Sequence, residues 1–378
     1  MFIKISFKSL LVTSLAMMFI ASSCNNGTKD TAATASTSTS GVDTASVKIA
    51  EDAFLFGYSL AIMDITRKKL TNYETPGPNG APINQFGNKN SFPDYTFKDV
   101  VRPNADTYYS LAFCDLAKEP LVFSIPASNG RYYLMPMLDA YTNVFNSPGT
   151  RTTGDGAGNY LLTGPKWTGT VPAGITQIKA PTDIIWIAGR IKCDGKADGE
   201  KIVIPFQKKL VLTPLSAWGK PYTAPKGAVD ATVPKEDPNN FIGSMPIDKF
   251  FNYVNELMVN NPPATEDKAA MDLFAKIGVA PGAKFDINKF DTATQAAMQE
   301  IPKKVYAAFD QELAKPKQLF NGWNILIKPV EPSTSGSKDV LSYRLSIASN
   351  GSATLMVTSQ NRQPISFDGY VTLPEKEN

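Results

Sequence analysis

Ten polar and aromatic residues are the candidates for binding or chemistry in this chain of 378 residues. They lie between residues 100 and 190, among runs of strand-forming residues, where polar groups must satisfy one another or face a cleft. The candidate ligand-binding residues are Arg102, Asn104, Asp106, Tyr108, Asp139, Tyr141, Asn143, Arg151, Trp186 and Arg190. No nucleophile stands beside a base in this set, so it indicates binding before it indicates a reaction.

The first four candidates occupy alternate positions from 102 to 108, so in an extended segment their side chains point the same way. Asp106 can then accept hydrogen bonds from a ligand, and Arg102 can bind an anion with two parallel hydrogen bonds. The structural alternative is that Asn104 and Asp106 cap turns while Arg102 forms a buried ion pair.

Asp139, Tyr141 and Asn143 repeat this alternation. Facing inward in a β-sandwich they would line a cavity for a small polar or carbohydrate-like ligand, and facing outward they are ordinary surface.

The remaining three candidates have structural alternatives as well. Arg151 begins a glycine-containing segment (residues 151–158) that lacks the Gly-Lys-Ser/Thr ending of a phosphate loop, which favours a hairpin connection. Trp186 and Arg190 share one strand face, where stacking against neighbours is as good an interpretation as binding.

The chain contains no histidine, which excludes a Ser-His-Asp triad, a Cys-His pair and an imidazole zinc site. Asp106 and Asp139 are the weak candidates for catalysis, as the paired carboxylates of a histidine-free hydrolase, provided that they meet in space. No loop pattern argues for a calcium or magnesium site, so we expect neither a metal nor another cofactor.

Composition indicates a globular protein, with 43 % hydrophobic and 19 % charged residues. The net charge of +3 includes Lys4 and Lys8, which lie in a segment that we expect to be removed. Electrostatics therefore give no case for nucleic acid or for an acidic membrane surface as a partner.

Residues 1–24 have the layout of a bacterial lipoprotein signal peptide: two lysines, a short apolar run, and small residues before Cys24. Cys24 is the expected lipidation site, and the alternative is a plain signal peptide with a chance cysteine. Residues 25–43 are rich in Ser, Thr, Ala and Gly and predict a flexible tether with a span of roughly 25 Å. The sequence thus predicts a lipid-anchored protein of the bacterial cell envelope, on the outer membrane or the periplasmic face.

Hydrophobic spacing predicts a helix over residues 44–70, with Thr44 or Ser46 as its cap. Short strands without intervening helices follow at 108–114, 120–125, 132–138, 142–145, 159–163, 175–179 and 184–191. Three helices are expected at 240–259, capped by Ser244, at 265–277 and at 292–314, the last interrupted at Pro302. A hairpin of 341–348 and 353–359, with a third strand at 365–373, closes the chain.

These elements predict an α+β fold that is mainly β: an antiparallel, jelly-roll-like β-sandwich with an N-terminal helix, a helical middle module and a short C-terminal β-hairpin segment. The expected domains are the β-domain at 44–205, the helical connection at 206–320 and the β segment at 321–378. Cys114 and Cys193 permit a disulfide, but two buried free thiols are favoured because nothing local dictates pairing.

Six blocks of this chain resemble a bacterial family that pairs domain of unknown function 1254 with domain of unknown function 1214. They are residues 104–110, 130–133, 138–143, 147–151, 164–167 and 180–190. The resemblance implies a β-sandwich followed by a helical connection and a second, larger domain, with no reaction assigned. Only 55 residues follow Trp323, so the resemblance implies that the second domain is a shortened remnant.

The function expected from these features is that of an envelope lipoprotein whose β-domain binds a small polar or anionic ligand. A paired-carboxylate hydrolase is one alternative, and an envelope scaffold or assembly protein that self-associates, as a homo-oligomer, is the other.

Overall fold

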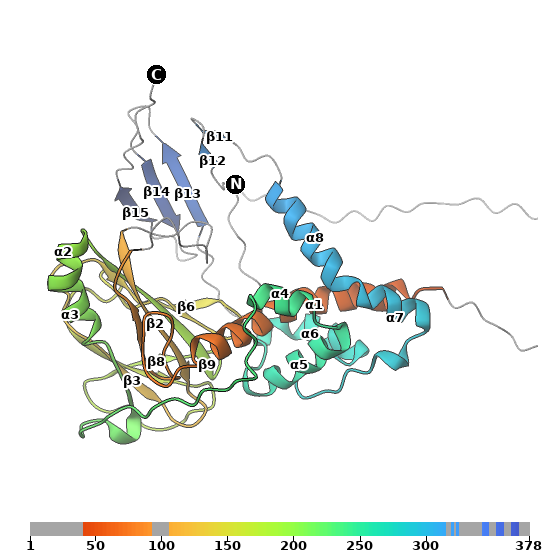
Figure 1. Cartoon of the computed structure of the whole chain (residues 1–378), viewed down its shortest axis with the longest axis horizontal. Coiled ribbons are helices and arrows are strands. Elements are labelled where there is room, and N and C mark those ends of the chain that lie inside the picture. Colours follow the sequence, from red (N-terminus) through yellow and green to blue (C-terminus); the bar gives the residue numbers. More distant parts are fainter. Residues whose placement is uncertain are drawn as a thin grey trace, which may run out of the picture. The chain divides into compact units, whose positions relative to one another are not determined.

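The computed structural model describes residues 41–92 and 106–314, together with five short strands between 319 and 369 (Figure 1). Arg102, Asn104 and Cys24, the expected signal peptide and nearly all of the expected tether lie outside these residues. Within the described part of the chain, no helix is both long and apolar enough to cross a membrane.

The first half of the described chain consists of one long helix followed by strands. Helix α1 spans Thr44–Leu70. The strands are β1 (Gly87–Lys89), β2 (Thr107–Asp115), β3 (Leu121–Ile125), β4 (Tyr133–Leu134), β5 (Met137–Leu138), β6 (Val144–Asn146), β7 (Gly158–Thr163), β8 (Thr176–Lys179), β9 (Ile184–Lys192) and β10 (Val211–Pro214).

The second half is helical until residue 314 and then returns to strands. The helices are α2 (Lys196–Asp198), α3 (Ile204–Gln207), α4 (Pro238–Gly243), α5 (Ile247–Asn260), α6 (Lys268–Phe274), α7 (Thr292–Gln299) and α8 (Ile301–Ala314). The strands are β11 (Leu319–Phe320), β12 (Trp323–Asn324), β13 (Ser342–Ile347), β14 (Ala353–Thr358) and β15 (Pro364–Gly369).

Helix α1 has the bounds that its apolar spacing predicts, but a different cap. The Asp43 carboxylate accepts a hydrogen bond from the Ser46 N–H at 3.1 Å, in place of the expected Thr44 or Ser46 cap. The buried face of α1 shares one hydrophobic core with α5, α6, α7 and α8. The N-terminal helix, expected to belong to the β-domain, therefore packs into the helical module.

Gly57 brings α1 unusually close to α5. A Cβ atom at this position would lie 2.9 Å from Cγ2 of Val254, closer than carbon atoms can pack. One turn away, the fully buried rings of Phe54 and Phe250 pack with their centroids 4.4 Å apart. The absence of a side chain at residue 57 thus sets the spacing of the two central helices.

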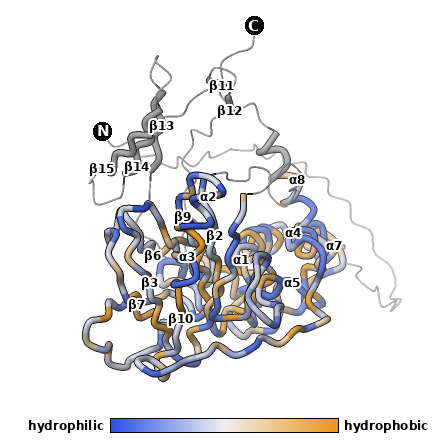
Figure 2. The backbone as a smooth tube through the Cα atoms, turned by 60° about the vertical axis from the view of Figure 1, so that its left-hand side comes forward, coloured by the Kyte–Doolittle hydropathy of each residue, from blue (hydrophilic) through white to orange (hydrophobic). Residues whose placement is uncertain are grey.

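The β-domain contains two sheets with a common core. Strands β1-β2-β9-β5-β6 form one antiparallel sheet, with β4 also paired to β9, and β10-β3-β7-β8 form the other. Fully buried residues of both sheets, such as Cys114, Phe123, Leu162 and Ile187, lie in one hydrophobic cluster. Figure 2 shows the apolar residues recurring along these strands and along α1 and α5, the elements of the two cores.

The α+β class is confirmed, with antiparallel sheets and an N-terminal helix, but the fold is not mainly β, because the helices build a core of their own. The strand order does not establish the expected jelly roll, since β7 and β8 pair in parallel.

Prolines explain two differences from the predicted elements. The strand expected at 132–138 is split into β4 and β5 by Met135 and Pro136. The helix expected at 240–259 is two helices, because Pro246 has no N–H for the ladder of α4 and instead precedes α5 as its cap residue. Ser244, the expected cap, donates its hydroxyl to the carbonyl of Phe241.

Two other expected elements are shorter than predicted: the helix at 265–277 is α6 with a short 3₁₀ turn on each side, and the strand at 142–145 is β6, which begins at Val144. The remaining ones are present. The helix at 292–314 is interrupted next to Pro302, between α7 and α8, and β13, β14 and β15 form the predicted hairpin and third strand. Cys114 and Cys193 are buried free thiols, as favoured from the sequence, and burial raises the pKa of Cys114.

The close approach at Gly57 gives a prediction about stability. Gly57→Ala should lower the free energy of unfolding by about 1–2 kcal/mol, because overpacking costs more than the about 1 kcal/mol that alanine gains in a helix. In a double-mutant cycle followed by urea denaturation, Val254→Ala should cost less in the Gly57→Ala background than in the wild type. Gly156→Ala, where an added Cβ meets nothing within 4 Å, is the matched control. Additive costs would contradict the proposed contact.

Candidate functional site

The first group of sequence candidates does not form a ligand-facing row within the described residues. Asp106 is exposed at the start of β2, and its carbonyl accepts the Cys193 N–H at 2.9 Å. Tyr108 is buried in the β-domain core, where it packs against Phe92 at 4.9 Å between ring centroids. Burial, together with a hydrogen bond to Cys193, raises the pKa of Tyr108.

The second group forms a buried turn rather than one face of a strand. One carboxylate oxygen of Asp139 accepts the N–H groups of Tyr141 and Asn143, both at 2.9 Å. These bonds hold the turn in which Thr142 has a φ of 70°, a conformation that costs a β-branched residue energy. Asp139 is thus a turn-stabilising residue, and the predicted alternation along a strand is wrong.

This turn is also where the β-domain contacts the helical module. The Tyr141 hydroxyl donates to the Asn261 carbonyl at 2.8 Å, and the Asn261 side chain accepts the Ile184 N–H at 3.1 Å. Burial raises the pKa of Asp139 to about 6, against the hydrogen bonds that lower it, and the carboxylate of Asp267 adds to the increase. Tyr141 is therefore bonded to Asn261 and Asn143 to Asp139, so both residues have partners within the protein.

The carboxylate pair required by the hydrolase interpretation does not form. Asp106 lies beside Cys193, just after the end of β9, whereas Asp139 follows Leu138, which pairs with Trp186 near the start of β9. Seven residues of extended chain separate positions 186 and 193, which is about 23 Å at about 3.3 Å per residue. Glycoside hydrolysis needs carboxyl groups about 5–9.5 Å apart, so Asp106 and Asp139 are not such a pair.

The remaining three candidates stack on aromatic neighbours. The guanidinium of Arg151 lies 5.0 Å from the ring centroid of Tyr132, and that of Arg190 lies 5.3 Å from the ring centroid of Tyr109. Trp186 stacks on Phe113 at 5.3 Å with an interplanar angle of 3°. Trp186 and Arg190 do share one face of β9, but each packs against a different residue of β2.

A different cluster, on α1 and α5, concentrates buried charge. Asp64 lies on the buried face of α1 with its side chain 8 % exposed. Arg67 donates from Nε and Nη2 to Oδ1 of Asp64 at 2.9 and 2.6 Å, and Lys68 approaches Oδ2 at 2.9 Å. The hydroxyl of Tyr253 also donates to Oδ2.

The protonation states in this cluster follow from its contacts. Burial raises the pKa of Asp64, but the Arg67 charge, the Tyr253 hydrogen bond and Lys68 outweigh burial and lower it overall. Burial and the neighbouring Asp64 carboxylate raise the pKa of Tyr253. At neutral pH Tyr253 is therefore a neutral donor to Asp64, and the Lys68 ammonium lies 4.8 Å from the Tyr253 ring centroid.

The wall facing this cluster comes from the loop between β10 and α4, and we call its residues 225–236 the strap. Asn72 exchanges two hydrogen bonds with the backbone of Asp230, at 2.9 and 2.6 Å. The Lys69 ammonium donates to the carbonyls of Lys235 and Glu236 at 3.2 and 2.6 Å. These bonds tie the strap to the C-terminal end of α1.

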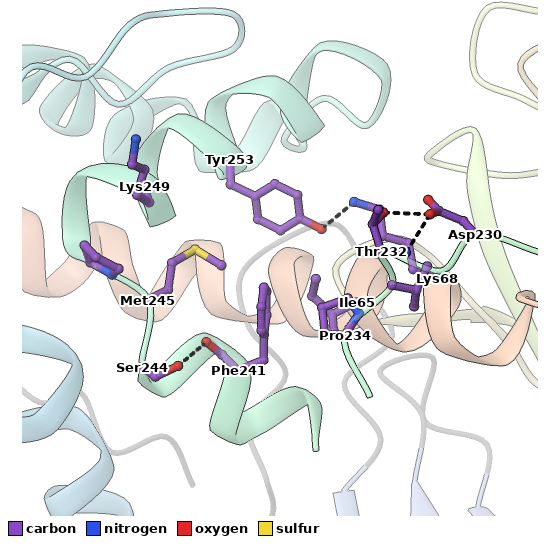
Figure 3. A pocket seen from close by; sticks show the side chains of 12 residues that line it. Ile65, Lys68, Asp230, Thr232, Pro234, Phe241, Ser244, Met245, Lys249 and Tyr253 are labelled. Atoms are coloured by element: carbon purple, nitrogen blue, oxygen red, sulfur yellow. Dashed lines mark hydrogen bonds between the residues drawn. The ribbon is translucent and has the colours of Figure 1, made fainter. Parts of the chain in front are cut away.

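Between α1, α4, α5 and the strap lies a pocket of about 590 Å³ (Figure 3). Its lining residues are Ile65, Lys68, Asp230, Thr232, Val233, Pro234, Phe241, Ser244, Met245, Pro246, Lys249 and Tyr253. The lining combines aromatic and aliphatic side chains with two lysines and one carboxylate. This volume is typical of sites for small organic molecules.

None of the sequence candidates lines this pocket. The chain offered one signal: Asp64 interrupts the apolar face of α1 at helical spacing from Leu60 and Ala61. Lys68 gives no such signal, because a lysine in the last turn of a helix is an ordinary partner of the helix dipole. Tyr253 and Lys249 come from a helix about 180 residues away in sequence, so their proximity depends on tertiary structure.

Metal binding has no candidate site in the part of the chain that the structure describes. There, no group of three or more aspartate, glutamate or cysteine side chains is placed to hold a metal ion.

Two segments of this chain match family models, and both models describe domains of unknown function. Residues 83–214 match the family model described as "Protein of unknown function (DUF1254)", which supports the predicted relation for that segment. No match to DUF1214 accompanies it. Residues 328–371 match "Domain of unknown function (DUF4251)" instead, which corrects the interpretation of the tail as a DUF1214 remnant.

Among solved structures, the VPA0106 protein from Vibrio parahaemolyticus is similar, with a TM-score of 0.51 and 24 % sequence identity. The similarity covers 71 % of this chain and 59 % of that one, so this chain matches less than two thirds of the length of that protein. This likeness supports the mixed α+β fold. No match to a curated protein is found.

The buried Asp139 predicts a pH dependence of stability. Its pKa of about 6 in the folded state exceeds the ordinary value of 3.8, so between these values the folded state binds more protons and stability falls as pH rises. In the wild type the free energy of unfolding should fall by on the order of 2–3 kcal/mol between pH 4 and 7, and Asp139→Asn should abolish this fall. Urea denaturation across this pH range measures it. Asp272→Asn, at an exposed position of α6, is the control. Identical pH profiles for wild type and Asp139→Asn would refute the buried-acid account.

Proposed function

We propose that this protein binds a small organic anion with an apolar body in the pocket between α1, α4, α5 and the strap. The observation that carries the proposal is the lining itself, which places two lysine side chains, Lys68 and Lys249, around an apolar space of about 590 Å³. The sequence predicts a small polar or anionic ligand in the β-domain; this proposal keeps the anionic alternative and assigns it to a site in the helical module.

The charges of the lining favour an anion. Asp230 is the acidic member, and its carboxylate accepts the Thr232 N–H and hydroxyl at 2.8 and 2.7 Å. These two bonds lower the pKa of Asp230 and direct its carboxylate into its own turn. Lys68 is shared with Asp64, whereas no carboxylate of the described residues forms an ion pair with the exposed Lys249. Lys249 is therefore the cation most available to a ligand.

The hydroxyl groups of the lining support binding rather than catalysis. The Tyr253 hydroxyl donates to Asp64, and the Ser244 hydroxyl donates to the Phe241 carbonyl at 3.0 Å. Two hydroxyls of the lining meet a carboxylate, Tyr253 at Asp64 and Thr232 at Asp230. The pKa of each of these carboxyl groups is lowered, which makes them weak bases for activating a nucleophile. A binding function is thus the one that the geometry supports best.

The binding proposal predicts a measurable affinity that depends on Lys249. Isothermal titration with medium-chain carboxylates such as octanoate should show binding, and octanol, which keeps the chain but lacks the charge, should bind at least ten-fold more weakly. Lys249→Ala should weaken octanoate binding by about five- to ten-fold, the loss of one charge-assisted contact. Lys276→Ala, which removes a lysine outside the lining, is the matched control. Equal affinity of wild type and Lys249→Ala for octanoate would sink the proposal.

We also infer that the protein is a lipid-anchored component of a bacterial cell envelope. The charged, apolar and small residues of positions 1–23, followed by Cys24, support this inference, as does the tether composition of residues 25–43. The scaffold alternative stays a prediction that self-association in solution would support.

Lipidation is testable on the intact chain. Expressed in a bacterium with labelled palmitate, the wild type should incorporate label and sediment with membranes, whereas Cys24→Ala should do neither. Cys193→Ala, which removes another cysteine, should label as the wild type does. Label retained in Cys24→Ala would contradict the assignment of Cys24.

A further inference from the structure

We infer that the ligand is an aromatic carboxylate, whose planar ring lies against Tyr253 and Phe241 and whose acidic group meets Lys249. This inference rests on the proposed function and specifies its ligand. It follows from the shape and stiffness of the lining rather than from its charge alone.

Tyr253 forms a wall that is fixed before any ligand arrives. Its hydroxyl is held by Asp64, and the ammonium of Lys68 lies 4.8 Å from its ring centroid and 3.2 Å from its hydroxyl oxygen. Asp64, Lys68 and the backbone of α5 already hold the ring, so it loses little further conformational freedom when a ligand binds. Tyr253 therefore offers a preorganised flat surface.

The rest of the apolar lining adds a second aromatic ring, a thioether and two prolines. Figure 3 shows Phe241 of α4 and Tyr253 of α5 extending into the pocket, with the side chain of Met245 reaching between them. Pro234 and Pro246 add two closed rings. The thioether of Met245 is a soft group that contacts aromatic rings favourably.

Flat aromatic walls favour a planar ring over a flexible chain. An aromatic ligand gains roughly 0.5–1.5 kcal/mol for each well-placed aromatic pair beyond the area it buries. A flexible aliphatic chain gains no such contact and loses rotational freedom when it is held. The pocket should therefore prefer an unsaturated ring over a saturated body of similar size.

The position of the cation completes the assignment. Lys249 and Tyr253 are four residues apart on α5, so they lie on the same face of the helix, with their Cβ atoms about 6 Å apart. A carboxylate attached directly to the ring can reach the Lys249 ammonium while the ring covers Tyr253. A single acidic group matches a single available lysine.

The test compares 2-naphthoate with two relatives, using isothermal titration of the full chain. Decahydronaphthalene-2-carboxylate keeps the charge but lacks the aromatic ring, and 2-naphthalenemethanol keeps the ring but lacks the charge. We expect 2-naphthoate to bind about three- to ten-fold more tightly than the saturated acid, and the alcohol to bind more weakly than both. Phe241→Leu should reduce the preference for 2-naphthoate over the saturated acid, while Phe290→Leu, outside the lining, should leave it unchanged.

The outcomes separate this inference from the binding proposal. Equal affinity for the aromatic and the saturated acid in the wild-type protein overturns the aromatic assignment and leaves anion binding intact. Binding of neither acid, with no binding of octanoate, overturns both. The comparison of ligands on the wild type does not depend on whether Phe241→Leu folds.

Discussion

Helices α1 and α5 lie as close together as they do because residue 57 has no side chain. Val254 occupies the space that a Cβ atom would need, and the buried rings of Phe54 and Phe250 pack beside it. Two turns along α1 from Gly57, Asp64 meets Tyr253, the residue that precedes Val254 on α5. A wider spacing of the helices would separate these two side chains, so the charged cluster and the pocket next to it depend on the contact at Gly57.

The charged cluster carries an energetic cost that its geometry offsets. A carboxylate as buried as that of Asp64 is destabilising unless it is paired and hydrogen-bonded. Arg67 and Lys68, one turn along the same helix, and Tyr253 across the helix interface supply these partners. The same contacts fix the Tyr253 ring and leave Lys249 as the accessible cation. Stability of the helix pair and the recognition that we propose for the pocket thus depend on one set of interactions.

The polar residues of the β-domain show how a sequence pattern can imitate a site. Asp139 and Asn143 alternate as ligand-facing residues of a strand would, yet Asp139 accepts the backbone N–H of Asn143 and stabilises a tight turn. Tyr141 between them reaches the helical module through Asn261. Alternation fixes the direction of side chains only in extended chain, and a turn with a residue at positive φ breaks that relation.

The sequence by itself determined the elements whose signals are local. The bounds of α1, strands β2, β3, β7, β8 and β9, the interruption near Pro302 and the C-terminal hairpin follow from spacing, prolines and turn residues. Only the tertiary structure decided that α1 packs with α5 rather than on the sheets, that Asp106 and Asp139 lie at opposite ends of β9, and that Lys68 and Tyr253 share a pocket wall. These facts depend on contacts between distant segments, for which hydrophobic periodicity specifies the buried face but not its partner.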